Sequence, residues 1–155
     1  MLDQAPLPTI ALAADHGGFL LKQAIAAHLR AAGYTVTDFG CHSADRVDYP
    51  DYAHQVCDAV TSGAATYGVL VCGTGIGMSI AANRHPTIRC AHVSESTTAR
   101  LTRAHNDANV IALGGRLIGE EAAFDILRAF LTTPYEGGRH DQRLAKLLPS
   151  AKDRA

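Results

Sequence analysis

The chain has 155 residues, of which 47% are hydrophobic, and its 14 basic and 15 acidic side chains leave a net charge of −1 at pH 7. This length is typical of one globular domain with a core large enough to fold without disulfides or metals. The balanced charge, with no long basic run, argues against binding to nucleic acid or to anionic lipid. We therefore expect a small molecule as the partner.

The longest apolar runs are far shorter than the roughly 20 residues that a membrane span needs. The first eight residues, MLDQAPLP, lack the positive and apolar regions of a signal peptide, and residues 2–8 are expected to be a loose lead-in. The four cysteines are widely separated, with no histidine nearby at zinc-ligand spacing: Cys41, Cys57, Cys72 and Cys90. This pattern predicts free thiols in a reducing cytoplasm and no metal site.

Short apolar runs alternate along the chain with segments of helical periodicity. In chain order we expect a strand at 9–14, a helix at 19–32, a strand at 35–39, a helix at 51–62, a strand at 69–72, a glycine-rich turn and helix at 73–84, a strand at 88–93, a helix at 96–105, a strand at 110–113 and a helix at 120–131. Ser94 or Ser96 is expected to cap the fourth helix. This alternation predicts an α/β fold of three layers, Rossmann-like, with a five-stranded parallel sheet flanked by helices.

A tail follows the predicted core after Pro134. Residues 135–140, YEGGRH, form a flexible-looking link into a short amphipathic segment at 142–148, which carries three leucines. A segment this small cannot bury its leucines alone, so we expect it to dock on the body or on another subunit. The predicted organisation is one domain over 1–155, with the core at 9–133 and a C-terminal helical tail at 134–155.

In open parallel sheets, ligands bind beyond the carboxyl ends of the strands. Polar, glycine-rich segments follow three predicted strands: residues 15–18 (DHGG), 72–77 (CGTGIG) and 114–116 (GGR). The turn at 73–77 can aim successive backbone N–H groups at one point beside a helix N-terminus, which favours an oxyanion or a phosphate. A dinucleotide site is the alternative, but Met78 stands where the third glycine of that fingerprint belongs.

Cys72 precedes this turn directly. A thiolate is stabilised at a helix entrance, so Cys72 could act as a base or a nucleophile. The alternative is a buried strand cysteine that only packs. The glycine-rich anion site beside it favours the reactive role, whereas the other three cysteines lack such a setting and are expected to pack.

Other candidate residues have a functional and a structural interpretation each. His105 and Asn106 could supply a proton shuttle and a polarising amide, or cap a helix. Asp15 and His16 could act on a ligand, or organise a turn. The cations suited to phosphate are Arg116, Arg139 and Arg143, of which the last two would share a face of a helical tail; the alternative is a solvated surface. The remaining histidines considered, His28, His42, His54, His85 and His92, are assigned to the surface or the core.

Several ordered motifs run through nearly the whole chain. They are residues 14–19 (ADHGGF), 48–52 (DYPDY), 72–77 (CGTGIG), 105–107 (HND) and 135–140 (YEGGRH). With these motifs the chain resembles the type B ribose-5-phosphate isomerases, which are grouped with the galactose-6-phosphate isomerase subunits. The resemblance implies a Rossmann-like subunit in a homodimer or homotetramer, an active site at the subunit boundary, and aldose–ketose interconversion of a phosphosugar without metal or cofactor.

The resemblance also implies roles for particular residues. Cys72 would move a proton between C2 and C1 of the sugar, and Thr74 would assist proton exchange at the enediolate oxygens. His105 with Asp15 would open the furanose ring. The implied substrate contacts are His16, Tyr49, Gly73, Gly75, Ile76, Gly77, Asn106, Arg116, Arg139 and Arg143. Some members use a glutamate within the turn where this chain has Met78, so this sequence is of the cysteine type.

Two further alternatives stay open beside a nucleotide-binding domain. The substrate could be another phosphosugar, such as allose or galactose 6-phosphate or a four-carbon tetrulose phosphate, because one methylene of fit is worth only about 1–3 kcal/mol. The chain could also be a non-catalytic phosphosugar-binding module. The presence of Cys72, Thr74 and His105 together argues against a pure binder, which needs none of them.

Overall fold

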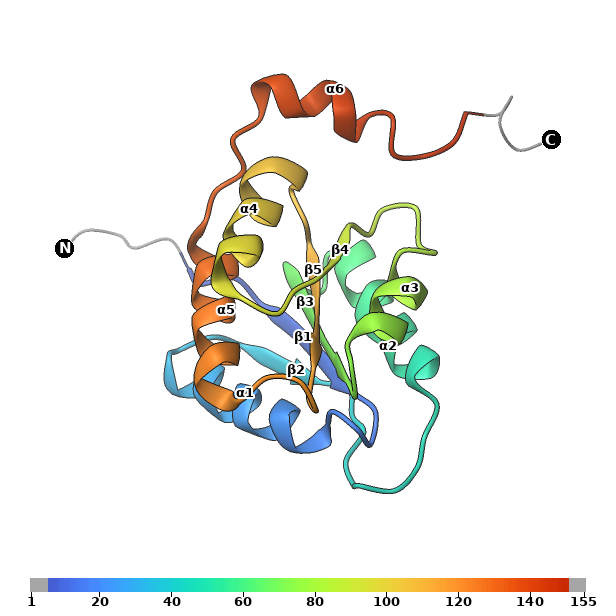
Figure 1. Cartoon of the computed structure of the whole chain (residues 1–155), viewed down its shortest axis with the longest axis vertical. Helices are drawn as coiled ribbons and strands as arrows, with labels where there is room; N and C mark the ends of the chain where they lie inside the picture. Colours follow the sequence, from blue (N-terminus) through green and yellow to red (C-terminus); the bar gives the residue numbers. More distant parts are fainter. Residues whose placement is uncertain (1–5, 151–155) are drawn as a thin grey trace.

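The computed structural model describes residues 6–150 and contains one parallel sheet of five strands (Figure 1). The strands are β1 (Ile10–Ala14), β2 (Val36–Asp38), β3 (Tyr67–Cys72), β4 (Cys90–His92) and β5 (Val110–Gly114), in the spatial order β2-β1-β3-β5-β4. The helices are α1 (Phe19–Ala31), α2 (Tyr49–Thr61), α3 (Ile76–Ala82), α4 (Ser96–Asn106), α5 (Glu120–Thr132), the 3-10 turn η1 (Gly138–His140) and α6 (Asp141–Leu144). The predicted fold class is confirmed.

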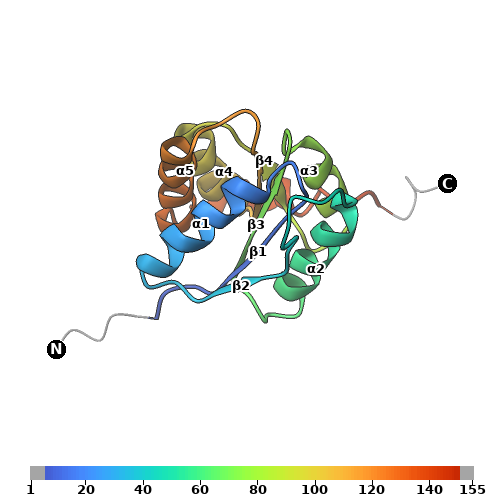
Figure 2. The same cartoon turned by 90° about the horizontal axis from the view of Figure 1, so that it is seen from below.

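Helices cover both faces of the sheet, so the molecule has three layers. Figure 2 shows α1, α4 and α5 on one side of the strands and α2 and α3 on the other. Because successive strand residues point to opposite faces, each strand contributes to two cores. One core holds Ile10, Leu12, Val69, Val71, Ile111 and Leu113 beneath α1, α4 and α5; the other holds Ala11, Ala13, Leu70, Cys72, Val110 and Ala112 beneath α2 and α3.

The face beneath α2 carries small side chains, and this brings the helix close to the sheet. A Cβ atom on Gly68 would lie only 2.6 Å from Cγ1 of Val56 on α2. The close approach holds the start of α2, and with it Tyr49, near the ends of β1 and β3. In the described part of the chain, no helix is long and apolar enough to cross a membrane.

A buried ion pair ties α1 to the end of β2. Lys22 is 1% exposed, and its Nζ donates to both carboxylate oxygens of Asp38, at 2.7 and 2.6 Å. The same carboxylate accepts the amide of Gly40 at 2.9 Å. The pair therefore fixes the loop after β2 beside the loop after β1.

Some predicted boundaries were wrong. The outer strands β2 and β4 have three residues each, because they pair on one side only and their ends leave the sheet. Neither serine caps α4: Glu95 is its N-cap, and the Glu95 carboxylate accepts the amides of Thr97 and Thr98. These hydrogen bonds, the Thr98 side chain first, lower the pKa of Glu95. Helix α3 begins only at Ile76, after a turn whose Gly75 is left-handed.

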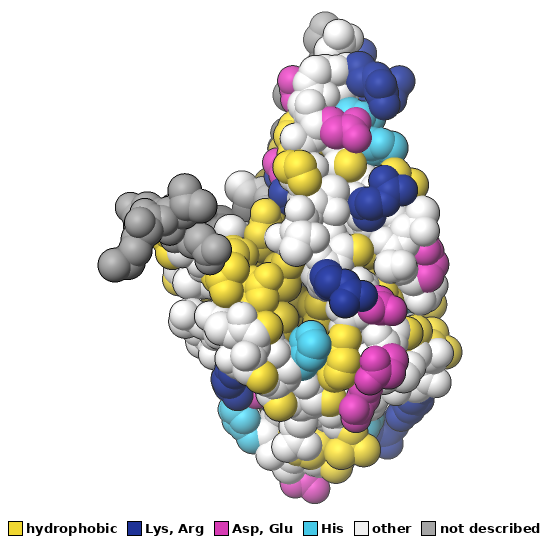
Figure 3. Space-filling model, turned by 90° about the vertical axis from the view of Figure 1, so that its left-hand side faces the viewer, with side chains coloured by type: hydrophobic (Ala, Val, Ile, Leu, Met, Phe, Trp, Pro, Cys, Tyr) yellow, Lys and Arg dark blue, Asp and Glu magenta, His cyan; other side chains and the backbone are white. Residues whose placement is uncertain are grey.

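The tail lies across the end of α4. The amide of Glu136 donates to the carbonyl of Ala104 at 3.0 Å, and the Tyr135 hydroxyl donates to Asp141 at 2.7 Å. Helix α6 has four residues, and beyond it Leu147 and Leu148 are 57% and 56% exposed. Figure 3 shows the tail standing above the rest of the molecule, with basic, acidic and histidine side chains on it. Residues 1–5 and 151–155, which include much of the expected lead-in and the end of the tail, lie outside the described residues.

Candidate active site

Three loops meet at the carboxyl edge of the sheet, as the strand-end rule predicts. Asp15 Oδ1 accepts the amides of Gly17 and Gly18, at 2.9 and 3.1 Å, and so shapes the turn after β1. The amide of Gly115 donates to the carbonyl of Cys72 at 2.8 Å, which joins the turn after β5 to the turn after β3. A Cβ on Gly115 would lie 2.7 Å from the Gly17 carbonyl oxygen. Glycine at these positions lets the three turns interlock.

Cys72 is the last residue of β3, and its side chain is nearly buried. Its Sγ accepts a hydrogen bond from the amide of Gly75 at 3.0 Å. This contact needs the left-handed backbone of Gly75, whose φ is +82° and whose missing Cβ would lie 2.8 Å from the His92 ring. The contact fixes the sulfur at the entrance of the glycine turn, with a backbone N–H directed at it.

The glycine turn also offers unused donors. The amide of Ile76 donates to the Thr74 hydroxyl oxygen at 3.3 Å, and that of Gly75 is taken by the sulfur. The amides of Gly73, Thr74 and Gly77 donate to no acceptor within residues 6–150. These three N–H groups are therefore the ones ready to bind an oxyanion beside the thiol.

Three further predicted residues surround this turn. A Cβ on Gly73 would lie 3.2 Å from the guanidinium NH1 of Arg116, so the exposed cation lies over the turn. The ring of Tyr49 covers Gly77, where a Cβ would approach it to 2.7 Å. His16 Nδ1 accepts the amide of Val47 at 3.3 Å, which holds the loop before α2 against the loop after β1.

His92 also belongs to this edge, whereas the sequence predicts for it only a place on the surface or in the core. It ends β4, and its Nε2 lies 2.8 Å from the carbonyl oxygen of Thr74. The ring therefore braces the turn that carries Thr74 and Gly75. The strand-end rule applied to the fourth strand would have found it.

The other three cysteines are packing residues with raised pKa values. Burial raises the pKa of Cys57 to about 12, and it raises the pKa of Cys90 and of Cys41 as well. No two of the four cysteines form a disulfide. The prediction that these three thiols pack is consistent with their positions.

His105 and Asn106 lie at the opposite edge of the sheet from Cys72. They end α4, which runs antiparallel to the strands and leads into the start of β5. There the Asn109 carbonyl accepts the amide of Gly68, the second residue of β3. Cys72 lies four positions further along the strand than Gly68, about 13 Å at 3.3 Å per residue. In Figure 1 the tail and the end of α4 lie at the top, and β3 and β5 end below.

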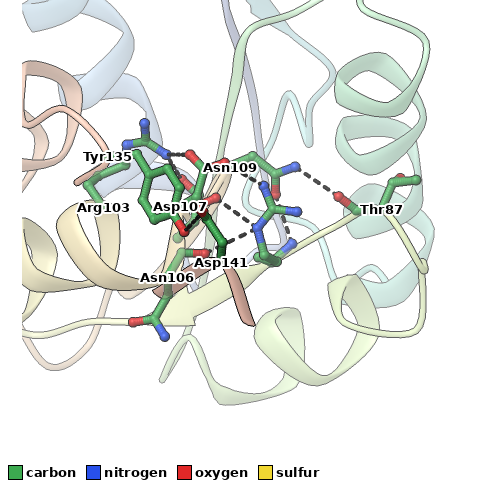
Figure 4. Close-up of polar contacts among 9 residues, drawn as sticks. Thr87, Arg103, Asn106, Asp107, Asn109, Tyr135 and Asp141 are labelled. Carbon is green, nitrogen blue, oxygen red and sulfur yellow. Dashed lines mark hydrogen bonds and ion pairs between the residues drawn. The ribbon is translucent and has the colours of Figure 1, made fainter. Parts of the chain in front are cut away.

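A polar network fixes the end of α4 (Figure 4). Asp107 adopts a left-handed conformation with a φ of +45°, and its carboxylate pairs with Arg103 at 2.8 Å and with Arg89 at 3.0 Å. Arg89 Nε also donates to the carbonyl of Asn106 at 3.1 Å. The network holds His105 and Asn106 in a defined place at this edge.

The tail brings more functional groups to the same edge. Arg139 and Arg143 lie on the continuous helical segment formed by η1 and α6. The ring of His140 stacks on that of His105, with centroids 4.5 Å apart and planes inclined by 20°. Glu136 completes this group, since its carboxylate lies 3.5 Å from His140 Nε2. No periodicity signalled the stack, because it joins a helix end to a loop 35 residues later.

A cavity of about 680 Å³ opens between the tail and the body at this edge. It is lined by Leu144, Leu147 and Leu148 of the tail, by residues 85–90, and by Asn106. The predicted site residues are thus divided into two groups. The catalytic-edge group is Asp15, His16, Tyr49, Cys72, Thr74, the glycine turn and Arg116; the tail-edge group is His105, Asn106, Arg139 and Arg143.

Comparison with known proteins gives consistent matches. Residues 10–147 match the family described as Ribose/Galactose Isomerase. The chain is 51% identical over 135 residues to the ribose-5-phosphate isomerase B of Escherichia coli K12, covering 87% of this chain and 91% of that protein. The structure of a Thermotoga maritima ribose 5-phosphate isomerase superposes with a TM-score of 0.89 at 50% identity, covering 90% and 96%. The Mycoplasma genitalium ribose-5-phosphate isomerase B, solved with bound ribulose 5-phosphate, superposes with a TM-score of 0.86 at 38% identity, covering 89% and 92%.

Proposed function

The chain belongs to the ribose/galactose isomerase family, and we propose that it is an aldose–ketose isomerase that interconverts ribose 5-phosphate and ribulose 5-phosphate. The observation that carries the proposal is the position of the Cys72 sulfur at the end of β3, beside unused amides of the glycine turn, at whose Gly73 the Arg116 guanidinium lies. The substrate is that of the relatives, which are named ribose-5-phosphate isomerases.

The reaction requires the groups that this edge supplies. Isomerisation moves a proton from C2 of the open-chain aldose to C1, through an enediolate whose oxygens gain charge. In our proposal Cys72 takes the proton from C2 and returns it to C1. The amides of Gly73, Thr74 and Gly77 stabilise the enediolate, and the Thr74 hydroxyl exchanges protons with its oxygens. Arg116 holds an anionic group of the substrate.

Ribose 5-phosphate must first open its ring. The C1–O4 bond breaks, O4 takes a proton, and the 1-hydroxyl loses its proton to form the aldehyde. We assign this step to His105, working with Asp15, and we assign the substrate phosphate to His16, Arg139 and Arg143. These residues carry the charges and proton-transfer groups that the step needs.

A complete site would then join two copies of the chain, because the thiol and His105 lie at opposite edges of the sheet. The exposed apolar side chains support such an assembly. Leu20, Tyr49, Ile76, Ile80 and Leu117 surround the catalytic edge, and Leu147 and Leu148 project from the tail. Apolar patches of this kind mark interaction surfaces. We propose a homodimer, or a tetramer built from it, in which the tail of one copy covers the catalytic edge of the other.

The four unpaired cysteines support a cytoplasmic location, where thiols stay reduced. Other phosphosugars remain alternative substrates, since the substrate length that a pocket between two copies accepts depends on the assembly. Comparing the kcat/KM of four-, five- and six-carbon aldose phosphates ranks them directly.

The test is ribose 5-phosphate isomerisation in the presence of EDTA, with ribulose 5-phosphate detected directly. We compare the wild type with Cys72→Ala and with the matched control Cys90→Ala. Losing the base should lower kcat by about 10³-fold while Cys90→Ala stays near wild type, since proton transfer contributes 10²–10⁴-fold. The thiol mechanism would be contradicted if EDTA abolished the activity of the wild type. It would also be contradicted if Cys72→Ala remained active.

A further inference from the structure

We propose that His140 is a positioning residue for His105: its buried ring holds the His105 ring in the orientation that opens the furanose. This inference rests on the proposed function, in which His105 carries out ring opening. The two residues lie side by side in one chain, so the contact does not depend on a second copy.

The stack is the first observation. The two imidazole rings are nearly parallel, with centroids 4.5 Å apart and planes inclined by 20°. His140 is only 5% exposed, whereas the His105 ring is partly open to solvent. A fixed ring against one face restricts rotation of the His105 ring. A proton donor held in one orientation loses less freedom when the substrate binds, and small misplacements of a catalytic group are costly.

The tail fixes His140 from both sides. Before it, the amide of Glu136 donates to the carbonyl of Ala104, the residue next to His105, at 3.0 Å. After it, Asp141 accepts the hydroxyl of Tyr135 at 2.7 Å. Gly137 and Gly138 both have positive φ, at +63° and +59°, and their backbone turns the tail so that the His140 ring meets α4. The segment therefore places one ring on a helix end.

Packing, more than polar contact, holds the His140 ring. Its Nε2 is buried and has no hydrogen-bond partner within residues 6–150, and Glu136 Oε2 lies at 3.5 Å, beyond hydrogen-bond length. The ligand atoms of His105, Glu136 and His140 lie within 4.8 Å of one another, a grouping that could suggest a metal. However, two ring planes inclined by only 20° do not meet near the rings, so both nitrogens cannot point at one ion. The stack therefore depends on the flat shape of the His140 ring and not on its nitrogen atoms.

Two assays separate ring opening from proton transfer. Ribulose 5-phosphate has its carbonyl at C2 and a phosphate on O5, so it cannot close a furanose ring. Exchange of its C1 proton with D2O, followed by NMR, needs Cys72 but no ring opening. Conversion of ribose 5-phosphate to ribulose 5-phosphate needs both steps. The variants are His140→Ala, His140→Phe, His105→Asn and the exposed tail control Gln142→Ala.

We expect His140→Ala to lower kcat for ribose 5-phosphate by about 10- to 100-fold, as misplacement of a catalytic group does. Its C1 exchange rate should stay within about twofold of wild type, as should both activities of Gln142→Ala. His140→Phe keeps a flat ring and should recover most of the loss. The inference is overturned if His140→Ala converts ribose 5-phosphate normally, if both of its activities fall equally, or if His140→Phe is as impaired as His140→Ala. If His105→Asn converts ribose 5-phosphate normally, the assignment of ring opening to His105 fails instead.

Discussion

At the scale of single residues, one chain holds four cysteines whose surroundings differ. Cys57 and Cys90 lie among apolar side chains, and burial raises the pKa of each well above neutrality, to about 12 for Cys57. Cys72 instead ends a strand at a polar edge, with the Gly75 amide directed at its sulfur. The difference is produced by a single left-handed glycine, which turns the backbone so that its N–H meets the thiol.

Selective alkylation follows from this difference. At pH 7.5 the thiols of Cys41, Cys57 and Cys90 stay protonated, because desolvation raises their pKa values and keeps the thiolate fraction small. We expect iodoacetamide to modify Cys72 first, in step with loss of isomerase activity, and ribose 5-phosphate to slow both. Peptide mass spectrometry during the inactivation locates the label. Labelling of the partly exposed Cys90 ahead of Cys72, with activity retained, would argue against Cys72 as the reactive thiol.

At the scale of elements, the catalytic edge depends on how the loops after β1, β2, β3 and β5 are held together. Glycines let the loops after β1, β3 and β5 touch, whereas a buried ion pair holds the loop after β2. Lys22 reaches from α1 to Asp38, whose carboxylate also accepts the backbone amide of Gly40 and so fixes the position of Gly40. The amide of Ala14 in turn donates to the carbonyl of Gly40, which keeps β1 in register with this loop.

The two partners of this pair should not be equivalent. Asp38→Asn leaves the 1% exposed Lys22 as an unpaired buried charge, and we expect the free energy of unfolding to fall by about 3 kcal/mol. Lys22→Met leaves a carboxylate that is 19% exposed and keeps the Gly40 amide, so its cost should be smaller. Urea denaturation of the two variants measures the difference. Equal losses, or a greater loss in Lys22→Met, would contradict the expectation that the buried lysine is the costlier partner to leave unpaired.

At the scale of the whole molecule, the division of the proposed site between two edges makes assembly part of the chemistry. Parallel strands with helical crossovers put every helix end at the amino edge, so no rearrangement within the fold brings His105 to Cys72. In the proposed assembly, the exposed leucines of the tail and the exposed apolar side chains around the catalytic edge would be the complementary surfaces of two copies.

Mixing two inactive variants tests this arrangement. Cys72→Ala and His105→Asn should each be inactive on ribose 5-phosphate, but a dimer of one copy of each contains one site in which both residues are wild type. Equal amounts that exchange subunits freely at random should recover about a quarter of the wild-type activity, because half of the dimers are mixed and each has one intact site of two.

The control for this experiment mixes Cys72→Ala with Cys72→Ala that also carries His105→Asn. That mixture contains no intact site and should stay inactive. Recovery in the control, or none in the first mixture after subunit exchange has been verified by native mass spectrometry, would show that the site does not join two copies.

The sequence by itself determined the order of the elements, the parallel sheet and the catalytic edge. Helical and strand periodicity can be recognised over a few residues. The turns after Ala14, Cys72 and Leu113 are marked in the sequence by the glycines that follow these residues. The same rules place the end of α4 at the far edge, although the motif at 105–107 alone gave no sign of its distance from Cys72. The cap of α4 was predicted wrongly because a glutamate carboxylate can accept the first backbone amides of a helix as well as a serine hydroxyl can.

Only the tertiary structure decided which distant side chains touch. The brace of His92 on the Thr74 carbonyl and the stack of His140 on His105 join segments 18 and 35 residues apart, so no spacing along the chain encodes them. The crossovers and the path of the tail set these contacts, and both are fixed by how the helices pack on the sheet. Contacts within one turn follow from local chemistry, whereas contacts between elements follow from packing of the whole core.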